Sequence, residues 1–294
     1  MESGIVVRAI GGYFRVLLDD GRLVETRPRG RLRKDGAAIL VGDRVDVSLQ
    51  PDGSGAVEKV YPRRNQLVRP PVANIDQVVI VTALADPPPN FGLLDRLLTA
   101  AEATGVTPLL CWNKADLVAD EAVAEAVAPY EAAGYRNIVT SAKTSRGLDQ
   151  LREALAGKIS TFAGPSGVGK SALLNGIHPE WRRETGAVSP KLGRGRHTTR
   201  AVELLVLPTG GLVADTPGFS ALELREIPAA ELSRYWPDID ALSGGCRFPG
   251  CRHKAEPDCA VRAAAAAGRL HPRRYESYLD LLDEIEEWEA RRYS

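Results

Sequence analysis

The stretch GPSGVGKS, Gly164–Ser171, sets the architecture of the middle of the chain. It matches GxxxxGK[ST], follows the apolar run ISTFA and opens a segment with helical character. Its three glycines let backbone N–H groups curl around phosphate oxygens, and the helix N-terminus adds partial positive charge. Lys170 can then reach β- and γ-phosphates, while the Ser171 hydroxyl can bind Mg²⁺. The predicted phosphate-binding residues are Gly164, Pro165, Ser166, Gly167, Val168, Gly169, Lys170, Ser171 and Ala172.

Two further motifs predict which base is bound. NKAD (residues 113–116) follows the apolar run TPLLCW, and TSAK (residues 140–143) follows the next strand-like run. The Asp116 carboxylate can accept hydrogen bonds from both guanine N1–H and the 2-amino group, whereas adenine offers neither donor there. Asn113 can join this loop to the phosphate loop, and the Ala142 N–H can meet guanine O6. The predicted guanine-binding residues are Asn113, Lys114, Asp116, Ser141, Ala142 and Lys143.

Two polar motifs complete the set. DTPG follows an apolar strand, so that Asp215 can hold Mg²⁺ through water and the Gly218 N–H can meet the γ-phosphate. HTTR (residues 197–200) lies in a polar stretch, where Thr198 or Thr199 can bind Mg²⁺ and the γ-phosphate when GTP is present. A solvated loop is the alternative for the threonines, because short polar motifs are common.

The order of the motifs is unusual. Ras-type GTPases run phosphate loop, switch threonine, DxxG, NKxD and SAK, whereas this chain runs NKAD, SAK, GPSGVGKS, HTT and DTPG. Joining the old ends and opening the chain between DxxG and NKxD produces this order, and close termini let such a cut leave a domain intact. The sequence therefore predicts a circularly permuted α/β GTPase domain whose DTPG motif leads directly into the C-terminal segment.

The flanking segments differ in character. Short strand-like runs between residues 5 and 60 predict a small barrel, and alternating strand and helix patterns after residue 72 predict a parallel sheet. Residues 63–72, RRNQLVRPPV, have the composition of a linker. After about residue 221 the strands stop and helices are predicted at 229–236 and around 275–288. The expected domains are 1–68, 69–221 and 222–294.

The first 70 residues carry 13 basic and 9 acidic side chains, although the whole chain balances 38 against 38. RPRGRLRK places five of these cations on one expected loop, which fits an RNA phosphate backbone or, as the alternative, a solvated loop. The candidate RNA-binding residues are Arg27, Arg29, Arg31, Arg33 and Lys34.

Three of the four cysteines lie close together with a histidine in CRFPGCRHKAEPDC. Three thiolates and an imidazole form a closed tetrahedral set, which predicts one structural zinc ion bound by Cys246, Cys251, His253 and Cys259. The alternative is a chance cluster of buried cysteines. Cys111 lies in an apolar run and is expected to be buried and inert.

The thiol usage and the lack of a long apolar run or a secretory start favour a cytoplasmic protein with no membrane contact. We expect it to be a monomer.

These motifs together resemble the circularly permuted, small-subunit-dependent ribosomal GTPases, the RsgA or YjeQ family. The resemblance covers nearly the whole chain: barrel, NKAD, TSAK, GPSGVGKS, GRGRHTT, DTPGF and the Cys-His cluster. It implies an OB-fold that binds RNA, a permuted GTPase domain, a helical zinc-binding domain, and a role in late maturation of the small (30S) ribosomal subunit with rRNA as partner.

The residue after DTPG is Phe219, where Ras-like enzymes carry a glutamine that orients water. This predicts slow intrinsic GTP hydrolysis and stimulation by a partner. His197 is the candidate to position water, and a partner contact is its alternative role. A guanine-nucleotide-gated RNA-binding module with incidental hydrolysis is the second hypothesis. An ATP-dependent P-loop kinase is disfavoured by NKAD.

Overall fold

The computed structural model describes residues 1–30, 38–68, 71–178, 203–214, 224 and 227–292. The chain divides into two compact units. The first comprises residues 1–77, 151–162 and 174–219, and the second comprises residues 78–150, 163–173 and 220–294. Within the described part, no helix combines the length and apolar character needed to cross a bilayer.

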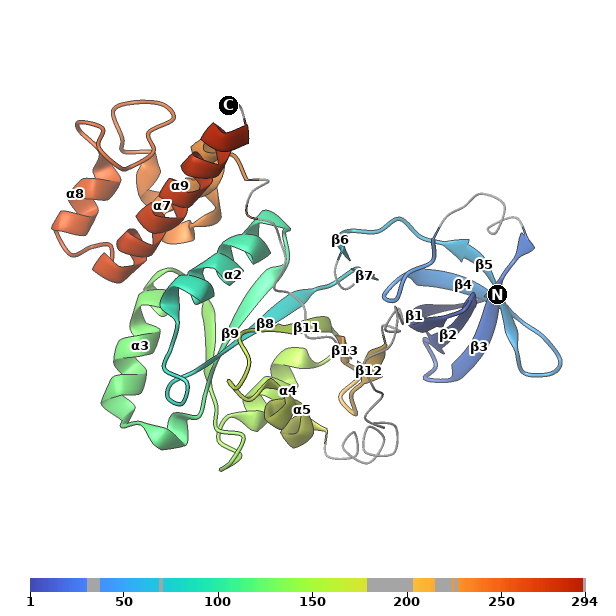
Figure 1. Cartoon of the computed structure of the whole chain (residues 1–294). Coiled ribbons are helices and arrows are strands. Elements are labelled where there is room, and N and C mark those ends of the chain that lie inside the picture. The colour runs from blue at the N-terminus through green and yellow to red at the C-terminus, as the bar shows by residue number, and fades with distance from the viewer. Residues whose placement is uncertain (31–37, 69–70, 179–202, 215–223, 225–226, 293–294) are drawn as a thin grey trace. The chain divides into compact units, whose positions relative to one another are not determined.

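The first unit begins with the small barrel that the sequence predicts (Figure 1). Its strands are β1 (Glu2–Ile10), β2 (Tyr13–Leu18), β3 (Leu23–Pro28), β4 (Arg44–Leu49) and β5 (Gly55–Val60). They form a closed sheet in the order β1-β2-β3-β5-β4, in which β1 closes against β4. Along β2, Phe14, Val16 and Leu18 are buried and alternate with outward residues. This alternation is the period-2 pattern that selects a strand with one face on a core.

The segment expected as a linker contains a small two-stranded sheet instead. It consists of β6 (Gln66–Val68) and β7 (Pro71–Ala73), which pair antiparallel. Leu67 lies opposite Val72 and both are buried, so the segment gains enough apolar burial to order its backbone. The prolines and charges that suggested a linker did not reveal this pairing.

The nucleotide motifs lie on a six-stranded sheet in the order β10-β9-β8-β11-β13-β12. Its strands are β8 (Gln77–Ala83), β9 (Thr107–Asn113), β10 (Arg136–Val139), β11 (Ile159–Ala163), β12 (Leu204–Val206) and β13 (Leu212–Ala214). β9 and β10 are parallel, as are β11 and β13, and β12 forms an antiparallel hairpin with β13. The strand before the phosphate loop, β11, lies between β8 and β13 in the sheet. The strands that precede β11 in the chain, β8 to β10, therefore lie on one side of it, and the strands that follow it, β12 and β13, lie on the other. This arrangement is what a permuted domain requires.

Helices connect these strands. They are α2 (Phe91–Ala103), α3 (Asp120–Ala132), α4 (Leu148–Leu155) and α5 (Lys170–Ile177), with a short 3-10 helix η1 (Ala115–Leu117). Every residue of β8 and β11 is buried. Such continuously buried strands are typical of a parallel sheet covered on both faces.

The C-terminal part of the second unit is helical (Figure 1). It contains the 3-10 helix η3 (Ala229–Tyr235), α7 (Pro237–Ser243), α8 (Ala260–Ala266) and α9 (Pro272–Arg292). The helix expected at 229–236 is thus a 3-10 helix that stops before Trp236, whose backbone is extended. The reason is Pro237, since a residue before proline avoids the α region. Tyr278, Leu282 and Ile285 form part of the core, as their helical spacing predicts.

Candidate nucleotide site and metal centre

The phosphate loop joins β11 to α5, and its glycines are required by close contacts. Gly164 has φ +127°, and a Cβ there would lie 2.1 Å from the Val81 carbonyl oxygen. Gly169 has φ +97°, and a Cβ there would lie 2.3 Å from Asn113 Nδ2. No other residue type fits these two positions, because backbone and a buried side chain occupy the space. The loop can therefore present bare backbone to a ligand.

Lys170 and Ser171 begin α5, as the sequence predicts. Lys170 Nζ donates hydrogen bonds to the carbonyl oxygens of Gly164 (2.8 Å) and Pro165 (2.7 Å). Burial lowers the pKa of this ammonium. A cation at the positive end of a helix is unfavourable by itself, and an anion bound at the same place would compensate both charges.

Asn113 joins all three motifs. Its Nδ2 donates to the Val168 carbonyl of the phosphate loop (2.8 Å), and its Oδ1 accepts from the Ala142 N–H and the Thr140 hydroxyl (both 3.2 Å). The side chain is only 1 % exposed, so these bonds are made out of water's reach. The Ala142 N–H, which the TSAK motif predicts to meet guanine O6, donates to Asn113 Oδ1 in this structure. NKAD, TSAK and the phosphate loop all lie in the second unit.

Asp116 lies exposed beside the TSAK loop. It accepts a hydrogen bond from the Ser141 hydroxyl at 2.6 Å, and Ser141 Oγ in turn accepts from the Thr144 N–H. The Ser141 hydrogen bond, followed by smaller electrostatic contributions from Lys143 and Lys114, lowers the pKa of Asp116. The carboxylate is therefore held ionised, in the acceptor-only form that recognition of guanine requires.

One segment of the site was missed by sequence reasoning. Lys114, in the left-handed region with φ +62°, donates a hydrogen bond from Nζ to the Asp86 carbonyl oxygen. Pro87 Cδ would be 3.7 Å from a Cβ on Gly167. The segment DPPPN (residues 86–90) thus adjoins both NKAD and the phosphate loop. The sequence feature that could have predicted this segment is its position shortly after the buried strand β8, at the sheet edge where β9 ends in NKAD.

Several predicted site residues lie outside the described part of the chain. They are Arg31, Arg33, Lys34, His197, Thr198, Thr199, Asp215 and Gly218.

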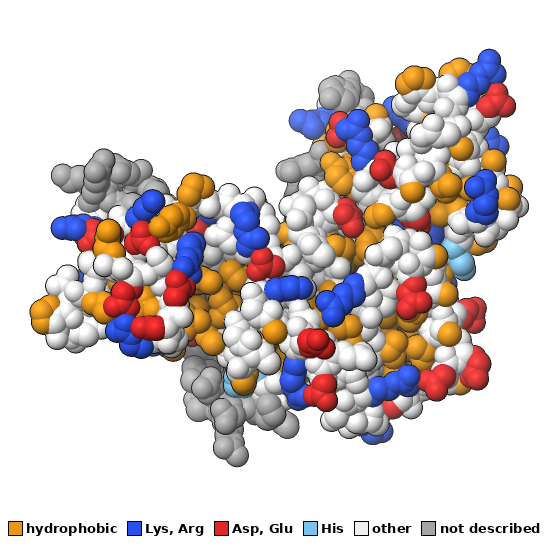
Figure 2. Space-filling view, turned by 180° about the vertical axis from the view of Figure 1, so that it is seen from behind, with side chains coloured by type: hydrophobic (Ala, Val, Ile, Leu, Met, Phe, Trp, Pro, Cys, Tyr) orange, Lys and Arg blue, Asp and Glu red, His pale blue; other side chains and the backbone are white. Residues whose placement is uncertain are grey.

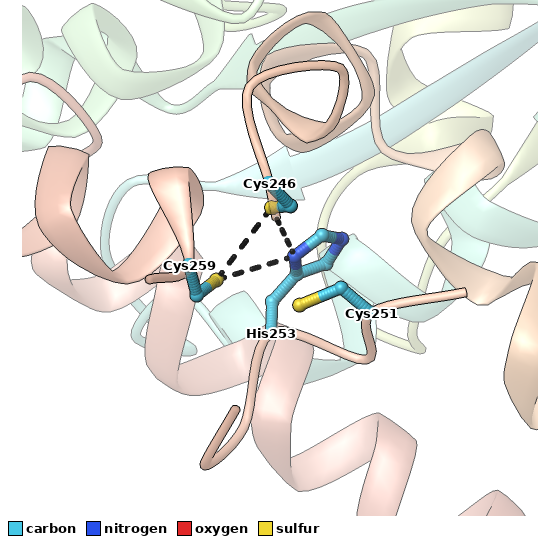
Figure 3. Close-up of side chains that lie close together, drawn as sticks. All are labelled: Cys246, Cys251, His253 and Cys259. Carbon is cyan, nitrogen blue, oxygen red and sulfur yellow. Dashed lines mark hydrogen bonds between the residues drawn. The ribbon is translucent and has the colours of Figure 1, made fainter. Parts of the chain in front are cut away.

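The predicted metal ligands do come together (Figure 3). The ligand atoms of Cys246, Cys251, His253 and Cys259 lie within 4.8 Å of one another. Cys246 Sγ is 3.8 Å from Cys259 Sγ, and each of these sulfurs is 3.5 Å from His253 Nδ1. A tetrahedral zinc ion with ordinary bond lengths requires about 3.8 Å between sulfurs and about 3.6 Å from sulfur to nitrogen. The cluster therefore fits a metal ion of that size and geometry.

The protonation of these ligands also suits a metal. Burial lowers the pKa of His253, which favours the neutral, coordinating imidazole. Burial alone would raise the pKa of Cys246, but backbone N–H groups of Val261 and Ala260 outweigh it and lower the pKa. Burial raises the pKa of Cys251 to about 12. A cation is what would turn that thiol into a thiolate ligand.

Charges elsewhere are mixed. Across the face shown in Figure 2, the Lys and Arg side chains of the described residues lie among Asp and Glu side chains and do not form one continuous basic patch. In the barrel, the candidate RNA-binding residue Arg29 pairs with Glu58 at 2.5 Å, whereas the Arg27 guanidinium donates a hydrogen bond to the Tyr13 hydroxyl and lies over the Tyr13 ring. Buried Cys111 has a pKa raised to about 12 by its burial, so its thiolate population is very small.

Comparison with known proteins agrees with this architecture. The RsgA GTPase family model matches residues 60–225, and the RsgA N-terminal domain model matches residues 3–57. A small ribosomal subunit biogenesis GTPase RsgA from Moorella thermoacetica is 49% identical over 96% of this chain and 97% of its own. Its counterpart from Caldanaerobacter subterraneus subsp. tengcongensis is 48% identical over 99% and 98%.

Two solved structures have the same fold along nearly the full length. YloQ, described as a circularly permuted GTPase, superposes with a TM-score of 0.85 at 36% identity, covering 98% of this chain and 96% of YloQ. YjeQ from Thermotoga maritima gives a TM-score of 0.83 at 36% identity, covering 97% and 98%. The permutation read from the motif order is thereby confirmed, and the chain belongs to the RsgA GTPase family.

Proposed function

We propose that this protein hydrolyses GTP to GDP and phosphate as a switch in late maturation of the small ribosomal subunit, which it leaves after hydrolysis. The observation that carries the GTPase assignment is Asn113, whose side chain bonds the phosphate loop and TSAK at once. The relatives named small ribosomal subunit biogenesis GTPases, up to 49% identical, support the choice of partner.

In the proposed complex, backbone N–H groups of residues 164–172 bind the phosphates and Lys170 neutralises charge developing on the β- and γ-oxygens. Asp116 selects guanine, with Lys114, Ser141, Ala142 and Lys143 around the base. Mg²⁺ neutralises phosphate charge when bound, and Ser171, Asp215 and Thr198 or Thr199 would hold it. The Gly218 N–H would meet the γ-phosphate.

Hydrolysis by the protein alone should be slow, because Phe219 has no group that can orient water. We propose that the small subunit stimulates turnover through the segment that contains His197, the residue proposed to position water. His197→Ala would then bind GTP normally but lose the stimulated rate. Full stimulation of that variant would exclude the role.

For the cluster of Cys246, Cys251, His253 and Cys259 we propose one structural zinc ion. The sulfur–sulfur distance and the two sulfur–nitrogen distances within the cluster support zinc, and a closed set of four protein ligands leaves no position for catalysis. Metal analysis of the purified protein should find about one zinc per chain. Cys259→Ser should lose it and show lower helical circular dichroism, since the ion replaces part of a core. Cys111→Ser, which changes a thiol outside the cluster, is the matched control.

The defining experiment measures GTP turnover by the protein alone, with small ribosomal subunits and with large subunits. Stimulation by the small subunit only is expected. Equal turnover in all three would leave a GTPase without the proposed trigger. Sedimentation of the free protein tests whether it is a monomer, as proposed. Fractionation of cells tests the proposed cytoplasmic location.

A guanine-nucleotide-gated RNA-binding module is the second candidate, favoured by Phe219. Lys170→Ala separates the two, because it should lower turnover on the order of 100-fold or more while RNA binding is kept. Normal release of this variant from small subunits would favour the binding module.

A further inference from the structure

A cavity of about 390 Å³ opens beside the cluster of Cys246, Cys251, His253 and Cys259. Its wall contains the first three of these residues but not Cys259, which is 5% exposed and belongs to the core of the helical part. Cys246 and Cys251 are only partly buried, so small molecules in solution can reach them through the cavity. Part of the same wall is the turn of residues 247–250, which joins the two cysteines.

This turn, RFPG, is exposed at each of its four positions. The Cys251 N–H that follows it donates to the Phe248 carbonyl oxygen at 3.3 Å. Phe248 is 43% exposed although its side chain is aromatic, so the turn places no side chain in the core. Cys251 can therefore move toward Cys246 with little loss of packing, whereas movement of Cys259 would disturb the close-packed core around it.

The sulfur atoms of the cluster lie close together. All four ligand atoms are within 4.8 Å of one another, and a disulfide requires two sulfurs at about 2.0 Å. Cysteines that bind a zinc ion are thiolates, which is also the form that reacts with oxidants. A closed set of four ligands leaves no place for an oxidant on the metal, so any reaction has to occur at sulfur.

We propose that Cys246 and Cys251 form an oxidation site, at which a peroxide converts the two thiolates into a disulfide and the zinc ion is released. One thiolate sulfur attacks a peroxide oxygen, the O–O bond breaks, and a sulfenic acid and a hydroxide ion form. The second thiolate attacks the sulfenic sulfur, so that the S–S bond forms and a second hydroxide ion leaves. The two sulfurs together lose two electrons, and the peroxide gains them.

The disulfide removes two of the four ligands, and His253 and Cys259 alone are too few for a structural zinc site. Hydrogen bonds to α9 hold this segment: the Tyr275 hydroxyl donates to the His253 carbonyl oxygen (2.6 Å), and the Tyr278 hydroxyl donates to the Arg252 carbonyl oxygen (3.1 Å). Release of zinc should loosen residues 246–259 from α9, and reduction by a thiol should reverse the change. The inference rests on the proposed zinc ion and adds the reaction that removes it.

Treatment of the zinc-loaded, full-length protein with hydrogen peroxide tests the proposal. The absorbance of a zinc-binding dye should show release of the bound metal, and dithiothreitol followed by added zinc should restore it. Trypsin cleaves after Arg and Lys, so it places the three cysteines on separate peptides, residues 235–247, 248–252 and 255–262. Mass spectrometry of the oxidised wild type should find the first two peptides joined by a disulfide.

Two variants separate this pair from the third cysteine. Cys251→His and Cys259→His both keep four ligands, two thiolates and two imidazoles, a set that zinc accepts. Cys251→His should release zinc roughly 10-fold more slowly than the wild type, because Cys246 would have only the buried Cys259 as its partner. Cys259→His keeps the pair at the cavity and should release zinc at close to the wild-type rate. Cys111→Ser, which changes a thiol outside the cluster, should release it at the wild-type rate as well.

Retention of zinc by the wild type, while glutathione in the same solution is fully oxidised, would overturn the proposal. A disulfide that joins Cys259 to either of the other two cysteines would also overturn it, as would equal release rates in the two histidine variants. The peptide map uses the wild type, so it decides the question even if a variant fails to fold. A protein purified without zinc would contradict the metal assignment itself, whereas a zinc-loaded protein that resists peroxide would contradict only the oxidation site.

Discussion

Asn113 and Asp116 have different tasks although they share one tetrapeptide. Asn113 is buried and bonds protein groups on both sides, whereas Asp116 is exposed and bonds Ser141. Loss of Asn113 should therefore disturb the whole site, while substitution of Asp116 should change base preference and leave the site assembled. This difference makes Asp116 the better residue for testing specificity.

Asp116→Asn should weaken GTP binding on the order of 100-fold or more, because the amide replaces one of the two acceptors that guanine needs. The same amide can donate to the C2 carbonyl of xanthine, so affinity for XTP should rise. Competition between labelled GTP and unlabelled XTP measures both changes. Asp120→Asn, on the neighbouring helix, is the control and should leave base preference unchanged. An Asp116→Asn variant that still preferred GTP would remove Asp116 from the base site.

Glu256 holds the turn between two of the proposed metal ligands, His253 and Cys259. Its carboxylate accepts hydrogen bonds from the backbone N–H groups of Arg252 (2.7 Å), Lys254 (3.0 Å) and Ala255 (3.1 Å). Burial would raise its pKa, but these backbone donors dominate and lower the pKa to about 2. The pKa of a glutamate in an unfolded chain is about 4.3. The stabilisation is therefore complete above that pH and is lost as the pH falls toward 2.

We expect the Glu256 carboxyl carbon to titrate with a midpoint near pH 2 in NMR spectra. Glu256→Gln should weaken metal binding roughly 10-fold at neutral pH, since residues behind a metal site orient its ligands. Chelator competition measures this effect, with Glu287→Gln on the exposed side of α9 as control. A midpoint at pH 4 or above would show that the three N–H groups do not hold the charge in solution.

At the scale of elements, the start of α2 determines how the DPPPN segment meets the nucleotide motifs. Asn90 is the N-cap, and its side chain accepts from the Leu93 N–H at 2.9 Å. Asn90→Ala should lower the free energy of unfolding by about 1 kcal/mol, whereas Asn90→Asp should keep the cap. Urea denaturation measures both. If alanine had no effect, the position of DPPPN would depend on Lys114 and the Gly167 contact and not on the helix cap.

At the scale of the whole molecule, a buried ion cluster connects helices within the second unit. Arg274 of α9 is 1 % exposed, and its guanidinium makes two 2.9 Å hydrogen bonds to Asp238 of α7 and one to Asp95 of α2. The ring of Trp236 lies 4.2 Å from the guanidinium carbon. The helical C-terminal part is thus bound to α2, the helix that follows the DPPPN segment.

Arg274→Met should cost about 3–5 kcal/mol of unfolding free energy, because it leaves Asp95 and Asp238 buried without their cation. Adding Asp95→Asn should recover part of the loss, since it removes one buried charge. Denaturation followed by tryptophan fluorescence measures both. Arg291→Ala breaks an exposed pair with Glu287 on the same helix and should cost about 0.5 kcal/mol or less. A similarly small cost for Arg274→Met would show that this cluster does not hold the helices together.

The sequence alone determined the permuted GTPase fold, the barrel and the metal-ligand set, because each depends on local patterns. The glycines of GPSGVGKS lie within residues 164–171, and the four Cys and His residues of the cluster lie within residues 246–259, so each set can be read from one short stretch of chain. The helix expected around residues 275–288 followed from the spacing of Tyr278, Leu282 and Ile285, and in the structure it extends over Pro272–Arg292.

Only the tertiary structure revealed the β6–β7 pair, the contacts of the DPPPN segment and the cluster of Arg274. Each depends on strand register or on burial between distant segments: Asp95 and Arg274 are 179 positions apart. A charged residue in a helix sequence normally indicates a solvated face, so nothing local marks Arg274 as the residue that is buried. The spacing of residues in a short motif determines which functional groups lie together, so the sequence predicts the chemistry. Tertiary packing determines which residues from distant segments contact those groups, so only the structure shows these contacts.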